Sequence, residues 1–556
     1  MFACVRSWLA AVAMVLLSAA AIAQPIPPGE QPGRERERFT EPQAPRAQPG
    51  GTVISLPSTT APAGAAQVIL VVRDVRIVGS TVYSAAQLAP LYEDLIGETV
   101  SLQAVYDLAQ KITAKYGADG YVLSRAIVPP QELNPGGAIV RIQIIEGYVD
   151  KVEWPAALSR YRDFFSYYTA RITSERPANI RTIERYLLLA GDLPGLRFKN
   201  SLKPSAAQQG AATLVVEVTE KHFDALARVD NRGSKARGPH QYMASVTANN
   251  LLRIHEAFTV THAGAWQTRE LQYFAAGYRH VLTGEGLAAF ANASYGHGRP
   301  GTTVLELLEY KTNSAIVEAG FSYPFIRSRE RNLTVTVLGF ASDDRSDMLG
   351  DVNTIDRLRG VRGRLEVDYA DVFAAVNQIN LTYSRGFRGF GSTANDNQMS
   401  SRASGQVDFG KFEATFTRLQ PLFARTSLFL AAYAQHALTG LLSPELCGYG
   451  GRAFGRAFDP SELTADSCAI MLGELRYDLP HVWFSQLQAY GFADRAWLRN
   501  FAPAPGTPDK VDAASAGVGL RLGWPNIVTA DFSAAKVLDG PRAQEWRGFF
   551  IVTARY

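Results

Sequence analysis

Residues 361–369 read Val361-Arg362-Gly363-Arg364-Leu365-Glu366-Val367-Asp368-Tyr369. Successive side chains of an extended strand point to opposite faces, so this stretch has one apolar face and one charged face. The same alternation returns in residues 471–479, with Glu474 on the charged face, and in residues 518–522. Many long strands of this kind, joined in sequence, favour a transmembrane β-barrel with lipid outside and water within. The alternative is a soluble sandwich whose charged faces point to water.

The connections between these strands alternate in length. Long connections are expected near residues 297–311, 344–356, 388–401, 439–466 and 499–512, and short turns near 326–330, 370–372, 480–482 and 524–526. Long loops at one end and tight turns at the other are typical of an outer-membrane barrel. This pattern gives about 16 strands, an even number that places the preceding domains and the C-terminus on the same, periplasmic side. The final segment, Trp546–Tyr556, ends on an aromatic residue where the interface belt of such a barrel would lie.

The N-terminal 66 residues divide into two parts. Residues 1–23 have the features of a signal peptide, namely Arg6, an apolar run and the small-residue site Ala21-Ile22-Ala23. A membrane anchor is the alternative, but the apolar run is too short to span a bilayer. Residues 24–66 form a Pro-rich leader that we expect to be flexible, because its composition cannot bury enough surface to order itself. The sequence leaves open whether its charged segment, residues 34–38, forms a short plug helix.

Two repeats of one design follow the leader, at residues 67–147 and 148–221. In each repeat a short strand is followed by amphipathic helices and then by two more strands. In the first repeat, Leu102, Val105 and Ile112 are spaced to give a helix one apolar face. The predicted fold is therefore a transmembrane β-barrel of about 16 antiparallel strands, at residues 222–556, preceded by two small α+β domains.

Composition and motifs exclude several classes of function. The net charge is only +4 over 556 residues, and no block of Lys and Arg is dense enough to follow phosphates, so nucleic acid is not an expected partner. The eight histidines form no metal-binding pair at helical or finger spacing. No phosphate-binding glycine loop or nucleophile elbow occurs in the sequence. We therefore expect no catalytic residues, no cofactor and no metal, and a barrel-embedded hydrolase is the weaker alternative.

The connection at residues 439–467 combines glycines, arginines and aromatic residues, including Arg456 and Phe458. Glycine permits tight folding, and arginine can donate to a carboxylate while stacking on an aromatic ring, which suits a loop folded into a pore. Asp494 is the candidate partner of Arg456, because strand parity places Asp494 and Phe492 on the lumenal face. Breaking a partly desolvated pair would strand one of its charges. The alternative is two unrelated, solvated charges.

Two cysteines, Cys447 and Cys468, remain after removal of the signal peptide that contains Cys4. An even pair in an exported chain is typical of a disulfide in an oxidising compartment. We therefore expect Cys447 and Cys468 to be bridged.

The sequence resembles the two-partner secretion transporters, the haemolysin and filamentous-haemagglutinin secretion family within the Omp85 superfamily. The similar segments are Tyr116–Tyr121 and Val128–Leu133 in the first repeat, Leu188–Gly195 in the second, and Asp230–Ser234 and Ala248–Leu252 at the start of the barrel. The two repeats look like POTRA domains. Their number, two instead of the five or three of other superfamily members, favours two-partner secretion.

The resemblance also covers the pore loop, with departures. Residues 455–458, Gly-Arg-Ala-Phe, stand where the family has Val-Arg-Gly and an aromatic residue, and residues 492–496, Phe-Ala-Asp-Arg-Ala, stand where it has Phe-x-Asp-x-Gly. The resemblance implies a pore-loop lock of Arg456, Phe458, Asp494 and Phe492. The substitutions put in doubt how closely the loop packs.

The resemblance implies a function in export. The POTRA units would recognise the amino-terminal secretion domain of an unfolded exoprotein by strand addition and groove contacts. The barrel would then conduct the exoprotein outward, driven by its folding outside the cell. The expected partners are this exoprotein and outer-membrane lipids, with the chain acting as a monomer in the outer membrane. An outer-membrane protein assembly factor and a diffusion porin are the alternatives, and the exoprotein can be an adhesin, a haemolysin or another large protein.

Overall fold

The computed structural model describes residues 26–39, 45–50, 60–205, 208–480, 483–501, 508–525, 527–542 and 544–556. The predicted signal peptide, residues 1–23, lies outside the described residues. None of the helices in these ranges is long and apolar enough to cross a membrane.

The first α+β unit packs its helices on a four-stranded sheet with the order β2-β1-β4-β3. Its elements are β1 (Ile69–Val78), α3 (Ala85–Leu88), η2 (Ala89–Leu91), η3 (Glu93–Leu95), β2 (Thr99–Ser101), α4 (Leu102–Ala118), β3 (Arg125–Ile127) and β4 (Ala138–Ile145). The central strands β1 and β4 run parallel, and the outer strands pair antiparallel to them. Val105, Leu108 and Ile112 of α4 are buried against this sheet, as their helical spacing predicts.

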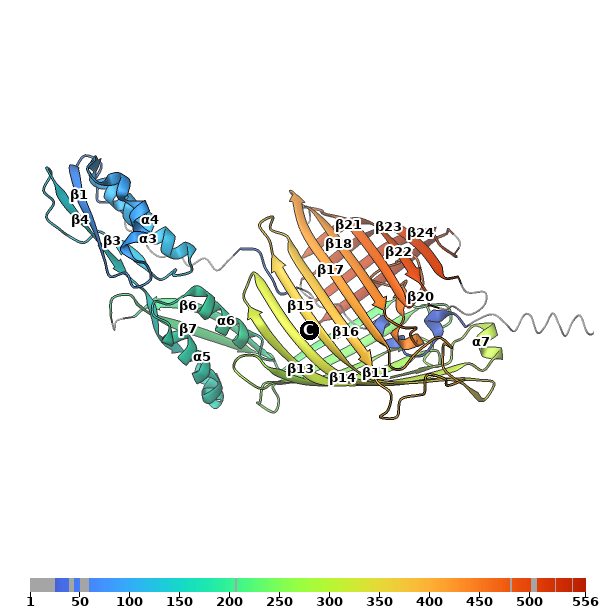
Figure 1. Ribbon diagram of the computed structural model, residues 1–556. Coiled ribbons are helices and arrows are strands. Elements are labelled where there is room, and N and C mark those ends of the chain that lie inside the picture. Colours follow the sequence, from blue (N-terminus) through green and yellow to red (C-terminus); the bar gives the residue numbers. More distant parts are fainter. Residues whose placement is uncertain are drawn as a thin grey trace, which may run out of the picture.

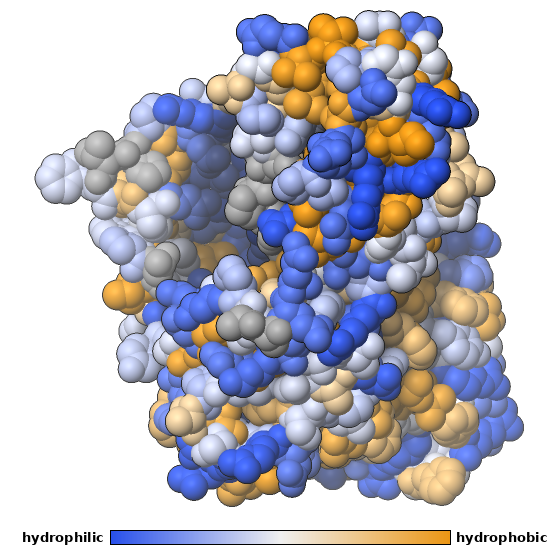
Figure 2. Space-filling model, turned by 90° about the vertical axis from the view of Figure 1, so that its left-hand side faces the viewer, coloured by the Kyte–Doolittle hydropathy of each residue, from blue (hydrophilic) through white to orange (hydrophobic). Residues whose placement is uncertain are grey.

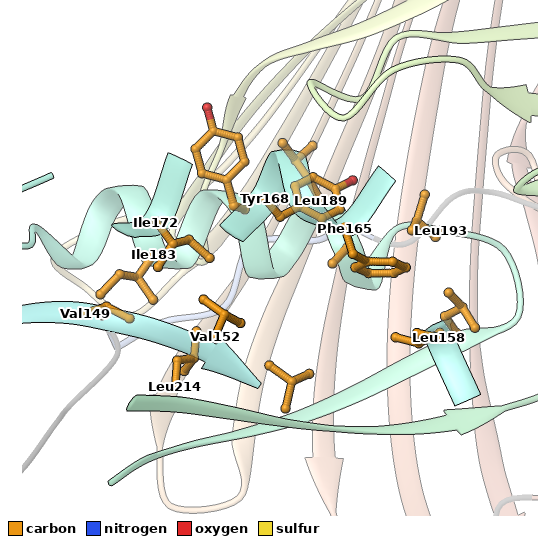
Figure 3. Packing of buried hydrophobic residues seen from close by; sticks show 14 of the residues in the cluster. Val149, Val152, Leu158, Phe165, Tyr168, Ile172, Ile183, Leu189, Leu193 and Leu214 are labelled. Carbon is orange, nitrogen blue, oxygen red and sulfur yellow. The ribbon is translucent and has the colours of Figure 1, made fainter. Parts of the chain in front are cut away.

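The second α+β unit has a three-stranded sheet with the order β5-β7-β6. Its elements are β5 (Tyr148–Glu153), η4 (Ala156–Tyr161), α5 (Arg162–Ser174), α6 (Ile180–Gly191), β6 (Leu196–Pro204) and β7 (Ala211–Glu220). Figure 3 shows its core, in which Phe165, Ile172 and Leu189 of the helices lie over Val152 and Leu214 of the sheet. The apolar helix faces thus give this small unit its own core.

Sixteen of the described strands that follow β7 form one closed antiparallel barrel. They are β8 (Phe223–Asp230), β9 (Gln241–Asn249), β10 (Glu256–Ala265), β11 (Gln272–Val281), β12 (Ala288–Gly298), β13 (Lys311–Arg327), β14 (Arg331–Met348), β15 (Asp351–Ala370), β16 (Val376–Gly386), β17 (Gly410–Phe423), β18 (Thr426–Ala437), β21 (Ser467–Asp478), β22 (Gln486–Arg499), β23 (Lys510–Trp524), β24 (Val528–Asp539) and β25 (Trp546–Arg555). The predicted fold class is confirmed. Both units lie beyond one end of the barrel, here called the proximal end, and the other end is the distal end (Figure 1).

The predicted alternation of side chains separates the two faces of the barrel wall. Large apolar side chains are exposed on the outside, among them Phe258, Phe274, Phe321, Val337, Met471, Leu475, Val518 and Phe532. Charged residues of the opposite parity, such as Glu474 and Asp494, are buried in the lumen. The barrel therefore has an apolar outer surface and a polar interior, as the sequence predicts.

The barrel closes where its first strand meets its last. Leu226–Asp230 of β8 pair antiparallel with Ile551–Arg555 of β25. This seam involves five residues of each strand, whereas β8 pairs with β9 over all of its length, Phe223–Asp230. The seam is thus a short ladder within the closed barrel.

The structure corrects one predicted connection, the long loop at residues 344–356. Here β14 and β15 continue as a hairpin joined by Leu349 and Gly350, which have φ values of 52° and 89°. Positive φ at both residues is what a two-residue type I′ hairpin turn requires. The polar run of residues 343–347 has the composition of a loop. These strands, however, are longer than the 9–11 residues needed to cross a bilayer, so their distal ends need not be apolar.

The structure also corrects the prediction of a flexible leader, since residues 26–39 and 45–48 make ordered contacts with the barrel, and the Ala65 carbonyl accepts from the Gln103 amide of the first α+β unit at 3.2 Å. The segment 26–39, here called the leader plug, contains η1 (Pro28–Glu30) and α2 (Glu35–Phe39). It lies at the distal end of the lumen (Figure 1). At the proximal end, the Ala47 amide donates to Asp368 at 2.6 Å, and the Gln48 amide donates to the Arg329 carbonyl at 2.8 Å. The polar composition of the leader rules out an apolar core but suits pairing with lumenal charges.

Candidate functional site

The candidate site is the loop of residues 438–466, here called the pore loop, which folds into the lumen. It carries η5 (Ser443–Glu445) and a small hairpin of β19 (Cys447–Tyr449) and β20 (Leu463–Ala465). Tyr449 and Phe458 of the loop are fully buried in a cluster with Tyr490, Phe492 and Phe549 of the barrel wall. The loop therefore occupies the side of the lumen that is walled by β21–β25.

The structure gives Arg456 a different partner from the one predicted. Its guanidinium donates to Glu474 on β21 at 2.5 Å, and the predicted side-chain pair with Asp494 is not formed. The side chain of Glu474 is 0% exposed and also accepts from Arg476 at 2.7 Å and from Arg521 at 2.8 Å. One carboxylate thus holds three arginines, one from the loop and two from the wall, because such a charge is stable away from water only when it is paired.

Asp494 binds the pore loop through a tyrosine hydroxyl instead. The hydroxyl of Tyr449 donates to the Asp494 carboxylate, which also accepts from the Ser515 hydroxyl at 2.9 Å. Burial and the neighbouring Asp494 raise the pKa of Tyr449, so its hydroxyl remains a hydrogen-bond donor. Asp494 is therefore a second attachment point for the loop, separate from Glu474.

The two predicted aromatic residues pack around the Arg456 attachment. The Arg456 guanidinium lies 4.6 Å from the centre of the Phe492 ring, a cation–π distance. Phe458 packs against Tyr449 with ring centres 5.1 Å apart. The structure thus brings Arg456, Phe458 and Phe492 into one cluster of buried side chains with Asp494.

Two further arginines hold the backbone of the pore loop, and sequence reasoning missed both. Arg232 donates to the Arg456 carbonyl at 2.6 Å and stacks over Phe549, and Arg547 donates to the Ala457 carbonyl at 2.8 Å. Their targets are backbone atoms, which leave no signal in a side-chain pattern. Parity places Arg547 on the lumenal face with Phe549, so the lumenal position of Arg547 could have been predicted from the sequence.

The leader plug is bound by the barrel wall and by the pore loop. Glu30 and Glu35 both pair with Arg237, in the loop between β8 and β9, at 2.9 and 3.2 Å. All three side chains are at most 4% exposed. On the other sides, Arg36 pairs with Glu318 of β13 at 2.7 Å, and Arg34 donates to the Leu446 carbonyl of the pore loop at 2.8 Å. Plug and loop thus lie together in the distal lumen, where both line a cavity of about 480 Å³.

Cys447 and Cys468 are joined by a disulfide that ties β19 of the pore loop to strand β21. Replacing both with serine is expected to destabilise the loop by about 3 kcal/mol, the entropy of closing a loop of this size in the unfolded chain. The check is the thermal unfolding midpoint of the purified protein with and without reductant. Reductant should lower the midpoint of the wild type and leave that of Cys447→Ser/Cys468→Ser unchanged; an unaffected wild type would contradict the assignment.

The second α+β unit docks on the proximal turns of the barrel. Glu285, in the turn after β11, accepts from Tyr167 at 2.6 Å, from Tyr186 at 2.8 Å and from Arg185 at 3.1 Å. Burial opposes ionisation of Glu285, but these three donors lower its pKa, so it docks as a carboxylate. Asp192 of the unit receives two hydrogen bonds from Arg327 at the end of β13, at 2.7 and 2.9 Å.

A buried histidine in another proximal turn is expected to make this docking sensitive to pH. His255 lies 4.8 Å from the ring of Tyr161 and 4.4 Å from that of Phe164, and burial lowers its pKa to about 4. Glu256 and His280 exert smaller, opposing effects on it. The released histidine binds a proton near pH 6.5 and the docked one does not, so we expect docking to be strongest above about pH 6.5 and to weaken toward pH 4.

His255→Phe keeps the ring packing without a titrating group and is expected to flatten this pH dependence. The measurement is amide hydrogen exchange in α5 at pH 7.5 and pH 4.5, corrected for intrinsic exchange. Acidification should lower protection more in the wild type than in the variant, because Glu285 and other groups titrate in both. Equal losses would show that His255 does not control docking.

The described part of the chain contains no group of three or more His, Cys, Asp or Glu side chains that could hold a metal ion. The contacts of the site are ion pairs, hydrogen bonds and ring packing. Such contacts can hold a loop and a plug in a lumen and release them again.

Comparisons with known proteins agree with this architecture. Residues 210–522 match the family described as haemolysin secretion/activation protein ShlB/FhaC/HecB, and residues 70–147 match the ShlB-type POTRA domain. The heme/hemopexin transporter protein HuxB of Haemophilus influenzae (strain 86-028NP) is 23% identical over 470 residues, 82% of this chain and 80% of that protein. The outer membrane transporter CdiB of Escherichia coli is 20% identical over 507 residues, 87% of this chain and 82% of that protein.

Solved structures give the same fold. CdiB from Escherichia coli superposes with a TM-score of 0.69 at 18% identity, covering 90% of this chain and 94% of that chain. CdiB from Acinetobacter baumannii superposes with a TM-score of 0.60 at 16% identity, covering 94% of this chain and 95% of that chain. These similarities extend over the α+β units as well as the barrel.

Proposed function

Since this chain belongs to the haemolysin secretion/activation protein family ShlB/FhaC/HecB, we propose that its two POTRA domains capture an unfolded exoprotein and deliver it to the barrel. The family consists of two-partner secretion transporters, which export a partner protein. The barrel lies in the outer membrane and the POTRA domains lie in the periplasm. The proximal end of the barrel is therefore periplasmic, and the distal end faces the cell exterior.

The observation that carries the proposal is the position of the second POTRA domain. Its Leu189 and Asp192 line the same cavity as Arg279 and Arg364 of the barrel wall, so the domain stands at the mouth of the lumen. A polypeptide bound by this domain is within reach of the lumen without a diffusive step. We assign capture to residues 67–147 and 148–221.

In this proposal the lumen is closed at rest by two separate elements. The pore loop is locked to the wall through Arg456, Phe458, Phe492 and Asp494, together with Glu474. The leader plug lies beside the pore loop in the distal lumen. Their contacts are polar, and an entering chain can replace them one at a time because water and its own groups supply new partners. Export then needs no nucleotide, and we propose that folding of the cargo outside gives direction and that the chain works as a monomer among outer-membrane lipids.

Deleting residues 68–220 is expected to abolish export while the barrel remains inserted and conducts ions. The readouts are secretion of a candidate exoprotein co-expressed with this chain, and conductance of the purified barrel in planar bilayers. A capture function predicts loss of the first with retention of the second. If the wild-type protein exports no exoprotein, the proposal is contradicted and a porin is favoured. If depletion of this protein lowers the level of many outer-membrane proteins, an assembly factor is favoured.

A further inference from the structure

A cavity of about 650 Å³ occupies the periplasmic half of the lumen. It is bounded by Leu189 and Asp192 of the second POTRA domain, by Gly286 and Pro324 near the periplasmic turns, and by the inner faces of β10–β15. Figure 2 views the molecule from this end and shows a deep hollow with mainly hydrophilic walls beside the POTRA domains. The cavity is therefore the first part of the lumen that a molecule from the periplasm meets.

Charges dominate the walls of this cavity. The four arginines in its lining are Arg36, Arg46, Arg279 and Arg364, and the three carboxylates are Asp192, Glu318 and Glu366. Two of the carboxylates are already shared with arginines behind the lining. Asp192 is held by Arg327 at 2.7 Å and Glu318 by Arg362 at 3.1 Å. The cavity thus has an excess of positive charge.

Two of these arginines are unpaired within the described part of the chain. Arg279 on β11 and Arg364 on β15 form no hydrogen bond or ion pair with any described residue, whereas Arg36 pairs with Glu318 and Arg46 lies 3.6 Å from Asp192. The third carboxylate, Glu366, likewise forms no ion pair there. Most other lumenal arginines of this barrel, such as Arg476 and Arg521, are neutralised by wall carboxylates. With no partner among the described residues, Arg279 and Arg364 are suited to bind an anion from outside the chain.

We infer that this cavity binds an acidic segment of the exported polypeptide through Arg279 and Arg364, an inference that rests on the proposed export function. Arginine suits the task because its planar guanidinium forms two parallel hydrogen bonds with a carboxylate. The two residues stand on strands four apart around the wall, so they can engage carboxylates spaced along a chain. An extended chain occupies about 155 Å³ per residue, from strand and sheet spacings, so the cavity holds about four residues.

The site serves capture and steering. Positive charge in a recess with low-dielectric walls raises the local concentration of acidic segments and their rate of entry. Each contact is partly solvated and therefore weak enough for the chain to move on. The segment of the exported polypeptide bound in the cavity would lie between the second POTRA domain and the leader plug.

The direct test measures binding of a fluorescein-labelled deca-glutamate peptide to the full-length protein in a non-ionic detergent, by fluorescence anisotropy. Deca-glutamate is expected to bind the wild type, and Arg279→Gln/Arg364→Gln is expected to raise its Kd about tenfold or more. The matched control is Arg345→Gln/Arg357→Gln, which removes two exposed arginines from the outer face of the distal hairpin and should leave the Kd unchanged. Salt should weaken binding to the wild type, because exposed ion pairs are screened.

Other probes separate the possible sources of an anion. Deca-lysine should not bind, and inorganic phosphate should compete with deca-glutamate only at far higher concentration. Equal binding of deca-glutamate to the wild type and the Arg279/Arg364 variant overturns the inference, as does phosphate competition at equal concentration, which would point to a free-anion site. Weaker peptide binding with an unchanged initial rate of export also overturns it. Failure of wild-type export contradicts the proposed function instead, and the peptide assay does not depend on export.

Discussion

Glu474→Ala is expected to destabilise the barrel by about 3–5 kcal/mol and to abolish the closed state of the pore loop, because it removes the carboxylate that three lumenal arginines share, and only Arg521 keeps another, Asp531 at 3.0 Å. Arg456 loses its carboxylate, and Arg476 and Arg521 then repel each other and the loop. The measurements are the thermal unfolding midpoint of the inserted protein and its single-channel conductance. We expect a lower midpoint and frequent openings.

The control for this variant is Asp343→Ala. Asp343 pairs with Arg359 at 2.7 Å, but its side chain is 53% exposed, and an exposed pair contributes at most about 1 kcal/mol. Arg456→Ala should fall between the two, since it leaves Glu474 with two of its three partners. A Glu474→Ala protein as stable and as closed as Asp343→Ala would show that Glu474 does not hold the loop.

Deleting residues 26–39 is expected to raise the conductance severalfold, because the leader plug separates spaces that would otherwise join. Arg36 of the plug lines both the periplasmic cavity of about 650 Å³ and a second lumenal cavity of about 480 Å³. Removing the plug merges them and empties the space beside Arg237. Conductance in planar bilayers measures this directly, and growth with a large antibiotic measures it in cells.

A milder variant tests the same contacts without shortening the chain. Glu30→Gln/Glu35→Gln keeps the plug but removes both carboxylates that pair with Arg237, so it should give a conductance between that of the wild type and that of the deletion. Replacing a charge partner by an uncharged one leaves Arg237 buried without compensation, which favours release of the plug. Unchanged conductance in the deletion would mean that the pore loop alone closes the lumen.

The sequence predicts the barrel and the inward loop because both leave local patterns. Alternation in residues 361–369 and 471–479 assigns each side chain to lipid or lumen, and that assignment correctly places Glu474 and Asp494 inside. Parity does not say which lumenal carboxylate meets Arg456. That depends on the register between β21 and β22. Glu474 of β21 pairs with Phe492 of β22, whereas Asp494 of β22 pairs with Leu472, two residues away from Glu474 along β21. The choice between the two carboxylates therefore required three-dimensional structure.

The leader was misjudged for a different reason. Low apolar content predicts that residues 24–66 cannot form a core of their own. It does not exclude order within another domain, where Arg237 and Glu318 of the barrel supply the opposite charges for Glu30 and Arg36 of the leader. The alternating charge of residues 34–38 is the one local signal in the leader. It is compatible with a short helix, but it does not indicate that this helix lies inside the barrel. A segment that is ordered by contacts with a distant part of the chain needs no periodic pattern in its own sequence.

The short seam between β8 and β25 has a consequence for assembly. It joins residues 226–230 to residues 551–555, the ladder of this barrel with the greatest separation in sequence, and contacts so distant form late because loop closure opposes them. Until that ladder forms, the sheet is an open trough, and residues 26–39 can settle into it sideways. After closure the same segment can enter or leave only lengthwise. The order of these two events in biogenesis therefore decides whether the plug is built in as the barrel is made or must be threaded into a finished one.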